Sequence, residues 1–253
     1  MAGSAESVSC TRVQLCGTFA VELHGRRVDH LLPGRQGRLL FGYLAQSRRQ
    51  QVSRDVLIDA LWGGSPPRAA SSALSVLISK VRAVVGPEVL RGRAMVSVTL
   101  PEPARVDVEV ATTALHTAES AVARGDWRRA WVASLPAQFV TRRRFLPETD
   151  APWAESWRRR LTEMHARALE AYATACLELG GAELAGAERA ARELLDVAPL
   201  RETGHLLLMR TLAARGNVAE AIAAYEYLRV LLREELGVNP CRAVQDAHAE
   251  LLG

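Results

Sequence analysis

The chain has 253 residues and a formal net charge of +4, with 49% hydrophobic and 24% charged residues. This globular composition argues against disorder along the whole chain, and no run of about 18 uncharged apolar residues predicts a transmembrane helix. The first 17 residues lack a basic start followed by an apolar core, so we expect no secretory signal and a cytoplasmic location.

Charge is unevenly divided along the chain. Residues 1–100 carry 13 basic and 6 acidic side chains, whereas residues 101–253 carry 19 basic and 22 acidic ones. The excess of positive charge in the first part favours a polyanionic partner there. Pro101 and Pro103 interrupt the pattern at the same place. We therefore predict a linker at this point and two domains, residues 1–102 and 103–253.

The first predicted elements, within residues 11–32, are β-strands. Val13 and Leu15 alternate with polar neighbours, and a second alternating run follows after Gly17. We expect a hairpin turn at His24-Gly25 followed by Arg26-Arg27, and a third short strand over residues 28–31.

Three helices are predicted next. The first spans residues 35–46, and the second begins after the capping residue Ser53 and ends at Gly63. The third begins at Ser65-Pro66, a cap followed by proline in the first turn, and continues to Val85.

Two faces of this third helix differ in chemistry. One is an apolar stripe at helical spacing, formed by Leu74, Leu77, Ile78, Val81 and Val85. The other carries small hydroxyls bounded by arginine. Short side chains allow close approach to a DNA major groove, and arginine can form two hydrogen bonds to guanine or phosphate. The alternative is an ordinary solvated face, although serine is a mediocre helix former. We predict base reading by Arg68, Ser72, Ser75, Ser79, Lys80 and Arg82.

Residues 89–100 alternate like two strands joined by a turn at Arg91-Gly92-Arg93. Three helices followed by a β-hairpin is the order of a winged helix, in which the hairpin reaches a minor groove or the DNA backbone. The alternative is a polar turn whose arginines contact only water. We predict phosphate contacts by Arg35, Arg54, Arg91 and Arg93.

From Val106 onward the pattern is helical throughout. Glycine and proline interrupt it near residues 125, 147–152, 180, 199, 216 and 237–240. Three residues recur 34 positions later, since Ala187, Ala190 and Leu194 reappear as Ala221, Ala224 and Leu228. This is the tetratricopeptide period, typical of stacked helix pairs whose concave face holds other proteins. The overall prediction is a mainly α fold with a small β component.

Motifs for catalysis or metal binding are absent from the sequence. The only lysine, Lys80, lies in ISKV, whereas a phosphate-binding P-loop needs GK followed by Ser or Thr. Cys10 and Cys16 have no matching ligand pair, so we interpret them as free thiols. The six histidines are scattered, and we expect His205 to pack between repeat helices. We predict no enzyme activity, no metal and no cofactor.

Two runs of three arginines stand out in the second part of the chain. We interpret residues 142–144 and 158–160 as solvated surfaces, with a contact to DNA or to an acidic protein as the alternative. We expect Trp127, Trp131, Trp153 and Trp157 to pack in the core or between helices.

The stretch LIDALWGGSPPRAASSALSVLISKVRAVVG resembles the OmpR-like winged helix of the Streptomyces antibiotic regulatory protein family. The stretch PLRETGHLLLMRTLAARGNVAEAIAAYEYLRVLLREELGVNP resembles the bacterial transcriptional activation domain of the same regulators. One departure is the hairpin, RGRAMVSVTLPEP, which lacks the Gly-Tyr pair that the family usually carries. The resemblance covers residues 11–252, with both modules in the family's order.

The resemblance implies a short member of the family, without the ATPase that longer members carry. Such a protein would activate transcription by binding direct repeats in promoter DNA as a homodimer, and by recruiting RNA polymerase holoenzyme through its sigma factor and other subunits. Its targets would be antibiotic biosynthesis genes, and it would act in the cytoplasm at the nucleoid, without a membrane partner. The alternative is a helical-repeat protein–protein adaptor whose winged helix no longer binds DNA.

Overall fold

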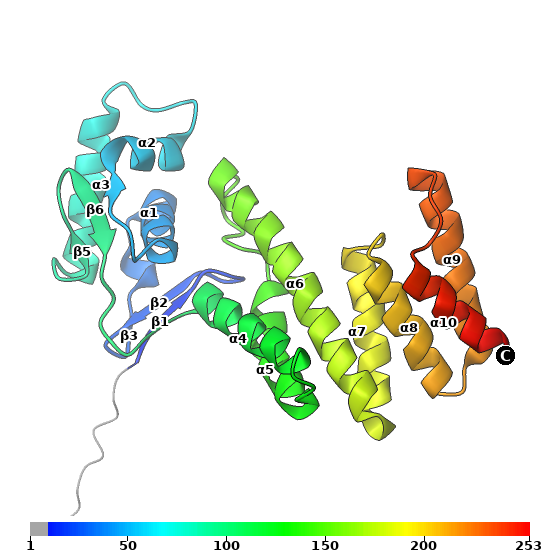
Figure 1. Ribbon diagram of the computed structural model, residues 1–253. Helices are drawn as coiled ribbons and strands as arrows, with labels where there is room; N and C mark the ends of the chain where they lie inside the picture. Colours follow the sequence, from blue (N-terminus) through cyan, green and yellow to red (C-terminus); the bar gives the residue numbers. More distant parts are fainter. Residues whose placement is uncertain (1–9) are drawn as a thin grey trace, which may run out of the picture. The chain divides into compact units, whose positions relative to one another are not determined.

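The computed structural model describes residues 10–253 (Figure 1). Residues 1–9 lie outside the described residues. They include most of the N-terminal segment in which we expect no secretory signal. The chain forms two compact units. The first contains the N-terminal part up to Val110 together with Arg143–Leu161, and the second contains Ala111–Arg142 together with Thr162–Gly253. The chain thus leaves the first unit, returns to it and leaves it again, and the boundary predicted at residue 102 stays a prediction.

A four-stranded sheet begins the first unit. Its strand order is β3-β2-β1-β7, and β7 pairs parallel to β1 while the other pairs are antiparallel. The strands are β1 (Thr11–Gln14), β2 (Ala20–Leu23), β3 (Arg26–Arg27) and β7 (Ala104–Val106). The segment after Pro103, which we predicted to leave the first domain, thus supplies an edge strand of the N-terminal sheet.

The β2–β3 hairpin turns at His24-Gly25, as the sequence predicts, and both residues have positive φ angles of 50° and 75°. The strand predicted over residues 28–31 is wrong. The strand is Arg26–Arg27, and a 3-10 turn at Asp29–Leu31 follows it. The Asp29 carboxylate explains the change, because it accepts hydrogen bonds from the Val21 backbone N–H and the Arg27 guanidinium and thereby ends the ladder.

Three helices and a small sheet complete the N-terminal part of this unit (Figure 1). Their core contains side chains with less than 2% exposure from every helix and from the hairpin, among them Phe41, Leu57, Leu74 and Leu90. The short strand before the second helix pairs with the hairpin, giving the strand order β4-β6-β5. The elements are α1 (Gly34–Gln46), β4 (Val52–Ser53), α2 (Arg54–Trp62), α3 (Ala70–Val85), β5 (Leu90–Arg91) and β6 (Met95–Val98).

The predicted ends of α2 are confirmed, whereas the predicted start of α3 is wrong. The Ser53 hydroxyl accepts a hydrogen bond from the Val56 N–H, and Gly63 ends α2 with a φ of 54°. Helix α3 begins at Ala70, after an N-cap at Ala69 that has no side-chain hydrogen bond. The prolines at positions 66 and 67 lie in a stretch without regular secondary structure, because each proline disfavours a helical conformation in the residue before it.

The segment Arg143–Leu161 packs against the N-terminal elements. Phe145 lies between Trp153 and Trp157, with ring centroids 6.0 and 5.6 Å apart, and its backbone bridges Cys16. The Trp153 indole N–H donates to the Ala60 carbonyl of α2 at 3.0 Å, and its ring meets Tyr43 edge-on at 4.8 Å. Both tryptophans are half-buried and pack against aromatic neighbours, as their apolar area predicts.

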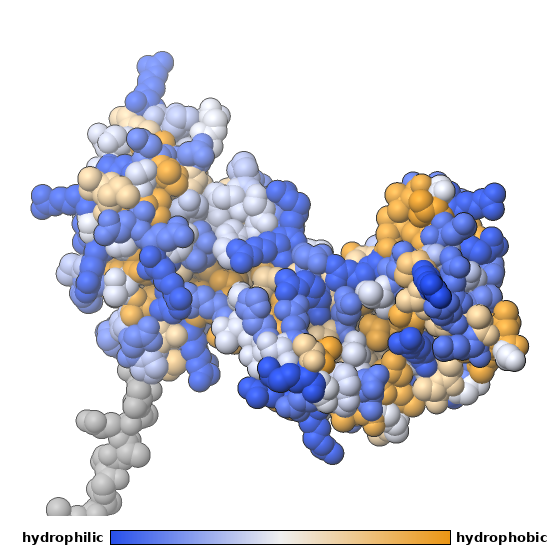
Figure 2. All heavy atoms as spheres, viewed as in Figure 1, coloured by the Kyte–Doolittle hydropathy of each residue, from blue (hydrophilic) through white to orange (hydrophobic). Residues whose placement is uncertain are grey.

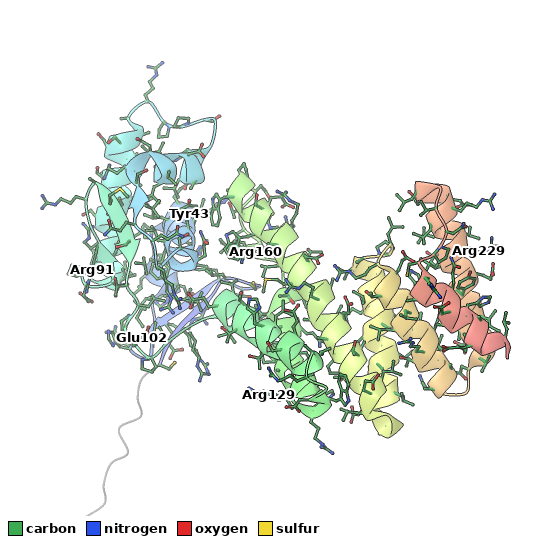
Figure 3. All side chains as sticks on the ribbon, in the orientation of Figure 1. Tyr43, Arg91, Glu102, Arg129, Arg160 and Arg229 are labelled. Atoms are coloured by element: carbon green, nitrogen blue, oxygen red, sulfur yellow. The ribbon has the colours of Figure 1, made fainter. Side chains whose placement is uncertain are left out.

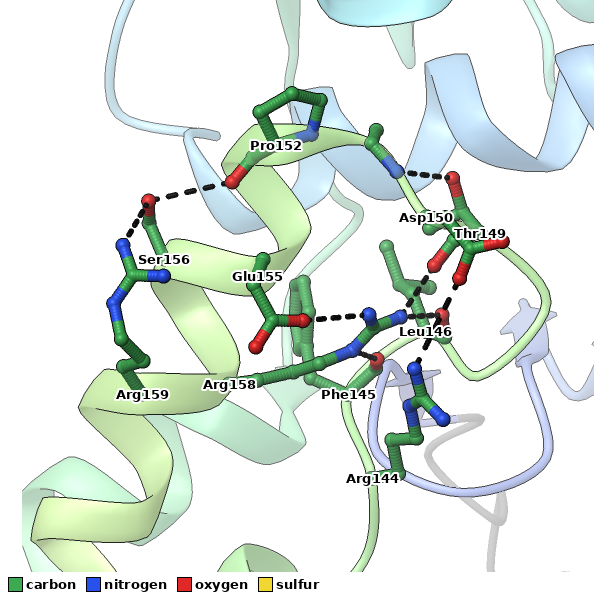
Figure 4. Close-up of polar contacts among 11 residues, drawn as sticks. Arg144, Phe145, Leu146, Thr149, Asp150, Pro152, Glu155, Ser156, Arg158 and Arg159 are labelled. Atoms are coloured by element: carbon green, nitrogen blue, oxygen red, sulfur yellow. Dashed lines mark hydrogen bonds and ion pairs between the residues drawn. The ribbon is translucent and has the colours of Figure 1, made fainter.

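Arg158 is enclosed by the loop before helix α6 (Pro152–Leu179), as Figure 4 shows. Its side chain is only 10% exposed and donates to the carbonyls of Phe145 at 3.1 Å, Leu146 at 2.9 Å and Thr149, while its Nη1 contacts Glu155. The predicted solvated surface is therefore wrong for Arg158, because its guanidinium donates to backbone carbonyls of the loop where a surface arginine would donate to water. Arg159 and Arg160 are exposed as expected.

The second unit is entirely helical within the described residues. The predicted breaks at Gly125, Gly180, Pro199, Gly216 and residues 237–240 all fall between observed helices. The helices, of which α4 and α6 also contribute their first residues to the first unit, are α4 (Asp107–Val122), α5 (Trp127–Thr141), α6 (Pro152–Leu179), α7 (Leu184–Val197), α8 (Glu202–Ala214), α9 (Val218–Leu236) and α10 (Arg242–Leu252), with a 3-10 turn at Gly181–Glu183.

Small residues allow these helices to approach closely. Ala187 and Ala221, which are related by the 34-residue spacing, are both fully buried. Gly204 on α8 faces α7, where a Cβ would lie 3.0–3.2 Å from leucine side chains. His205 is 1% exposed, with its Nε2 2.9 Å from the Pro199 carbonyl and its ring beside Tyr227 of α9. His205 thus packs among the helices, as predicted.

Candidate nucleic-acid interface

The apolar stripe of α3 is buried and its hydroxyl face is exposed. Leu74, Ile78, Val81 and Val85 have at most 5% exposure, and Leu77 is half-buried. The hydroxyl-bearing side chains Ser72, Ser75 and Ser79 are exposed, as are Lys80 and Arg68, although Arg68 precedes the first turn of the helix. The arrangement leaves one side of α3 available to a partner.

One residue on this surface was missed by the sequence analysis. Val76 follows Ser72 by one turn, precedes Lys80 by one turn, and is 54% exposed. It lies outside the apolar stripe, which is the signal that could have identified it. An exposed valine among hydroxyls offers the apolar contact that the methyl group of thymine accepts in a major groove.

Much of the positive charge on this surface has no carboxylate partner in the described part of the chain. Among residues 10–253, the side chains of Arg68, Lys80 and Arg93 have no carboxylate partner. Arg91 on β5 is exposed, and its Nε donates to the Glu88 backbone carbonyl at 2.9 Å (Figure 3). Hydrophilic side chains project from this part of the molecule in Figure 2. Unpaired cations around a surface of short hydroxyl side chains suit a polyanion.

The structure joins two of the predicted contact residues to the hairpin. The Arg82 Nε donates to the Leu90 carbonyl at 2.8 Å, and its Nη2 donates to the Gly92 carbonyl at 2.6 Å. Arg54 reaches Arg93 from α2, donating to its backbone carbonyl at 3.4 Å. Part of the donor capacity of each guanidinium is therefore already used inside the protein.

Arg35 is exposed at the start of α1. It lines a small cavity with Arg38 and Glu148, which form an ion pair at 3.0 Å. Within the part of the chain that the structure describes, no hydrogen bond or ion pair links Arg35 to α3 or to the hairpin. The structure thus brings nine of the ten predicted contact residues to α3, its preceding turn, the start of α2 and the hairpin, with Arg35 on a separate helix.

Groups that could support other chemistry lie apart from this surface. No cluster of three His, Cys, Asp or Glu residues that could hold a metal occurs among residues 10–253, and the four cysteines are free thiols. No helix in the same range is long and apolar enough to cross a bilayer. Burial lowers the pKa values of His165 and His205, and burial raises the pKa of the Cys176 thiol to about 11.

Residues 106–252 match the bacterial transcriptional activator domain. The chain belongs to the family that this domain defines. It is 32% identical over 205 residues to the regulatory protein AfsR of Streptomyces griseus, a match that covers 81% of this chain and 21% of that protein. AfsR of Streptomyces coelicolor is also 32% identical, over 218 residues that make up 86% of this chain and 22% of that protein. The chain thus spans about a fifth of the length of these relatives.

A solved structure shares the fold. EmbR of Mycobacterium tuberculosis, in complex with a low-affinity phosphopeptide, superimposes with a TM-score of 0.83 at 21% identity, covering 96% of this chain and 65% of that one. Together with the AfsR relatives, the domain match places the chain in the Streptomyces antibiotic regulatory protein family of transcriptional regulators. The resemblance noted in the sequence is therefore confirmed at the level of the family.

Proposed function

We propose that this regulator activates transcription by binding specific promoter DNA through an OmpR-like winged helix formed by α1–α3 and the β5–β6 hairpin. The observation that supports this function best is the face of α3, where Ser72, Ser75 and Ser79 stay exposed beside Lys80, which lacks a carboxylate partner within residues 10–253. Such a face fits the width of a major groove, and Arg68 and Val76 extend it at its edges.

The hairpin supplies the second half of the proposed interface. Arg91 and Arg93 flank Gly92 at its tip and are exposed. A hairpin beside a recognition helix reaches the adjacent backbone or minor groove, where arginine is favoured by the negative potential. Arg35, at the start of α1, would contact a phosphate from outside this cluster.

The role of the second unit follows from the family. We propose that protomers bind side by side on direct repeats and that the tetratricopeptide-like helices hold RNA polymerase holoenzyme, including its sigma factor, at genes for antibiotic biosynthesis. The protein would act in the cytoplasm at the nucleoid. A protein–protein adaptor without DNA binding is the competing function, and the exposed, cationic face of α3 disfavours it.

A salt titration of promoter binding tests this proposal. The first ligand is a DNA duplex identified by footprinting the promoters of the genes adjacent to the gene that encodes this protein. The second ligand is a random duplex of equal length. We expect the specific duplex to bind more tightly and log K to fall with log salt by about 0.9 for each phosphate contacted. Equal, weak binding to both duplexes at every salt concentration would favour the adaptor.

The hairpin is tested in the same assay. Arg91→Ala combined with Arg93→Ala should weaken both duplexes alike and reduce the salt slope by about 1–2, because phosphate contacts carry no sequence information. The matched control is Arg128→Ala, an exposed arginine on α5 of the second unit. A double variant that binds as the wild type does would exclude the hairpin tip from the interface.

A further inference from the structure

The tip of the β5–β6 hairpin is attached to the helices by two arginines. Arg82, in the last turn of α3, donates to the carbonyls of Leu90 and Gly92 at 2.8 and 2.6 Å. Arg54, the first residue of α2, donates to the Arg93 carbonyl at 3.4 Å. Three of the four carbonyls between residues 90 and 93 therefore accept a hydrogen bond from a guanidinium.

The two strands of the hairpin differ in how they are held: β6 pairs with β4 through Val52↔Val96 and Ser53↔Met95, whereas β5 pairs only with β6 among the strands of residues 10–253. Strand β5 has two residues, and its register with β6 consists of the pairs Leu90↔Val98 and Arg91↔Ser97. The loop begins at Gly92, whose φ is +88° and where a Cβ would lie 1.8 Å from the Met95 carbonyl oxygen. The backbone pairing of β5 is therefore short, and hydrogen bonds from a charged donor, which are roughly twice as strong as neutral ones, add to it at the tip.

Arg54 also contacts the hydroxyl face of α3. Arg54 donates through Nη2 to the Ser75 hydroxyl and to the Ser71 carbonyl, both at 2.7 Å. The Ser75 hydroxyl in turn donates to the Ser71 carbonyl at 2.8 Å. Arg54 thus connects one hydroxyl of the proposed base-reading face directly to the hairpin tip.

We propose that Arg82 and Arg54 are positioning residues, which fix the hairpin tip at one distance and orientation from the α3 face. This inference rests on the proposed DNA-binding function and refines it, because Arg82 acts through the hairpin and does not read a base. The guanidinium orients the backbone on both sides of Gly92, and so places the Arg91 and Arg93 side chains that reach phosphate.

The first test needs no DNA. Hydrogen exchange of the backbone amides at residues 91–95 is measured in the wild type, in Arg82→Ala and in the control Lys80→Ala, an exposed neighbour on the same helix. Losing two charge-assisted bonds should speed exchange at the hairpin tip by about 10-fold or more, with α1 and α2 unchanged. Arg82→Lys, which keeps one donor group, should give an intermediate rate. Unchanged exchange at the tip in Arg82→Ala would overturn the proposal.

The second test uses the footprinted duplex and a set of single base-pair substitutions. Arg82→Ala should weaken all duplexes by the same factor, and it should add less than 2-fold to the loss caused by Arg91→Ala with Arg93→Ala, because both act through the tip. A loss confined to one base pair would identify Arg82 as a direct reader and overturn the proposal. If the wild type binds no duplex, the DNA-binding function fails, while the exchange measurement still decides whether Arg82 holds the hairpin.

Discussion

Replacing Arg158 with alanine should destabilise the first unit more than the same replacement of its neighbours Arg159 and Arg160. The side chain donates to three backbone carbonyls of residues 145–149 and is 10% exposed. The substitution removes the hydrogen bonds from this charged group, so each carbonyl loses its donor and has to be hydrated by water instead. A hydrogen bond to a charged group contributes about 1.5–3 kcal/mol net. Because water can replace part of this set, we expect a loss of about 2–4 kcal/mol.

The matched control is the adjacent Arg159. It is exposed, and its side chain bonds to the Ser156 hydroxyl at 3.1 Å and to no other group among residues 10–253, so Arg159→Ala should cost less than about 0.5 kcal/mol. The assay is urea unfolding followed by tryptophan fluorescence, to which Trp153 and Trp157, both in contact with Phe145, contribute along with the other three tryptophans of the chain. Equal unfolding free energies for Arg158→Ala and Arg159→Ala would show that the loop carbonyls are as well satisfied by water, and would refute the reasoning.

Three further predictions concern burial and backbone conformation. Leu74→Ala, in the fully buried stripe of α3, should lower the unfolding free energy by about 2–5 kcal/mol in the same assay, and a loss below 1 kcal/mol would contradict the packing. Gly92→Ala should weaken DNA binding while leaving the global unfolding midpoint nearly unchanged, because the clash is confined to the hairpin tip; wild-type affinity would argue against it. Burial lowers the pKa values of His165 and His205 in the folded protein. As pH falls, these two imidazoles are therefore protonated in the unfolded chain before they are protonated in the folded protein. Stability should therefore decrease as pH falls below about 6.5, by up to about 1.4 kcal/mol per pH unit for each histidine, and urea titrations at pH 7.5 and 5.5 should show a smaller decrease in His205→Gln.

Local patterns in the sequence predict most elements of this fold. Leu74, Ile78 and Val81 share one helical face, and that face is buried. The turn at His24-Gly25 and the cap at Ser53 were also predictable, because each depends on residues next to it in the chain.

The features that sequence reasoning missed depend on contacts between distant residues. Residues 104–106 form β7 because they pair with β1, which lies more than 90 positions earlier in the chain. A stretch of three residues is too short to show an alternating pattern that would predict this pairing. The sequence does not distinguish Arg158 from its exposed neighbours, because the loop carbonyls that bind it are brought to it only by the fold. Arg82 lies at helical spacing from the serines, yet the geometry of the hairpin decides which groups its donors reach.

The return of residues 143–161 to the first unit has a consequence for how the chain folds during synthesis. The N-terminal elements leave the ribosome well before Phe145 and Trp153, whose contacts with Cys16 and Ala60 complete this unit. Helix α5 must be translated in between. The nascent first unit therefore stays incomplete until residue 161 has emerged, and an early stop or a cut at residue 102 would leave its sheet without β7 and the Ala60 carbonyl of α2 without the indole N–H of Trp153.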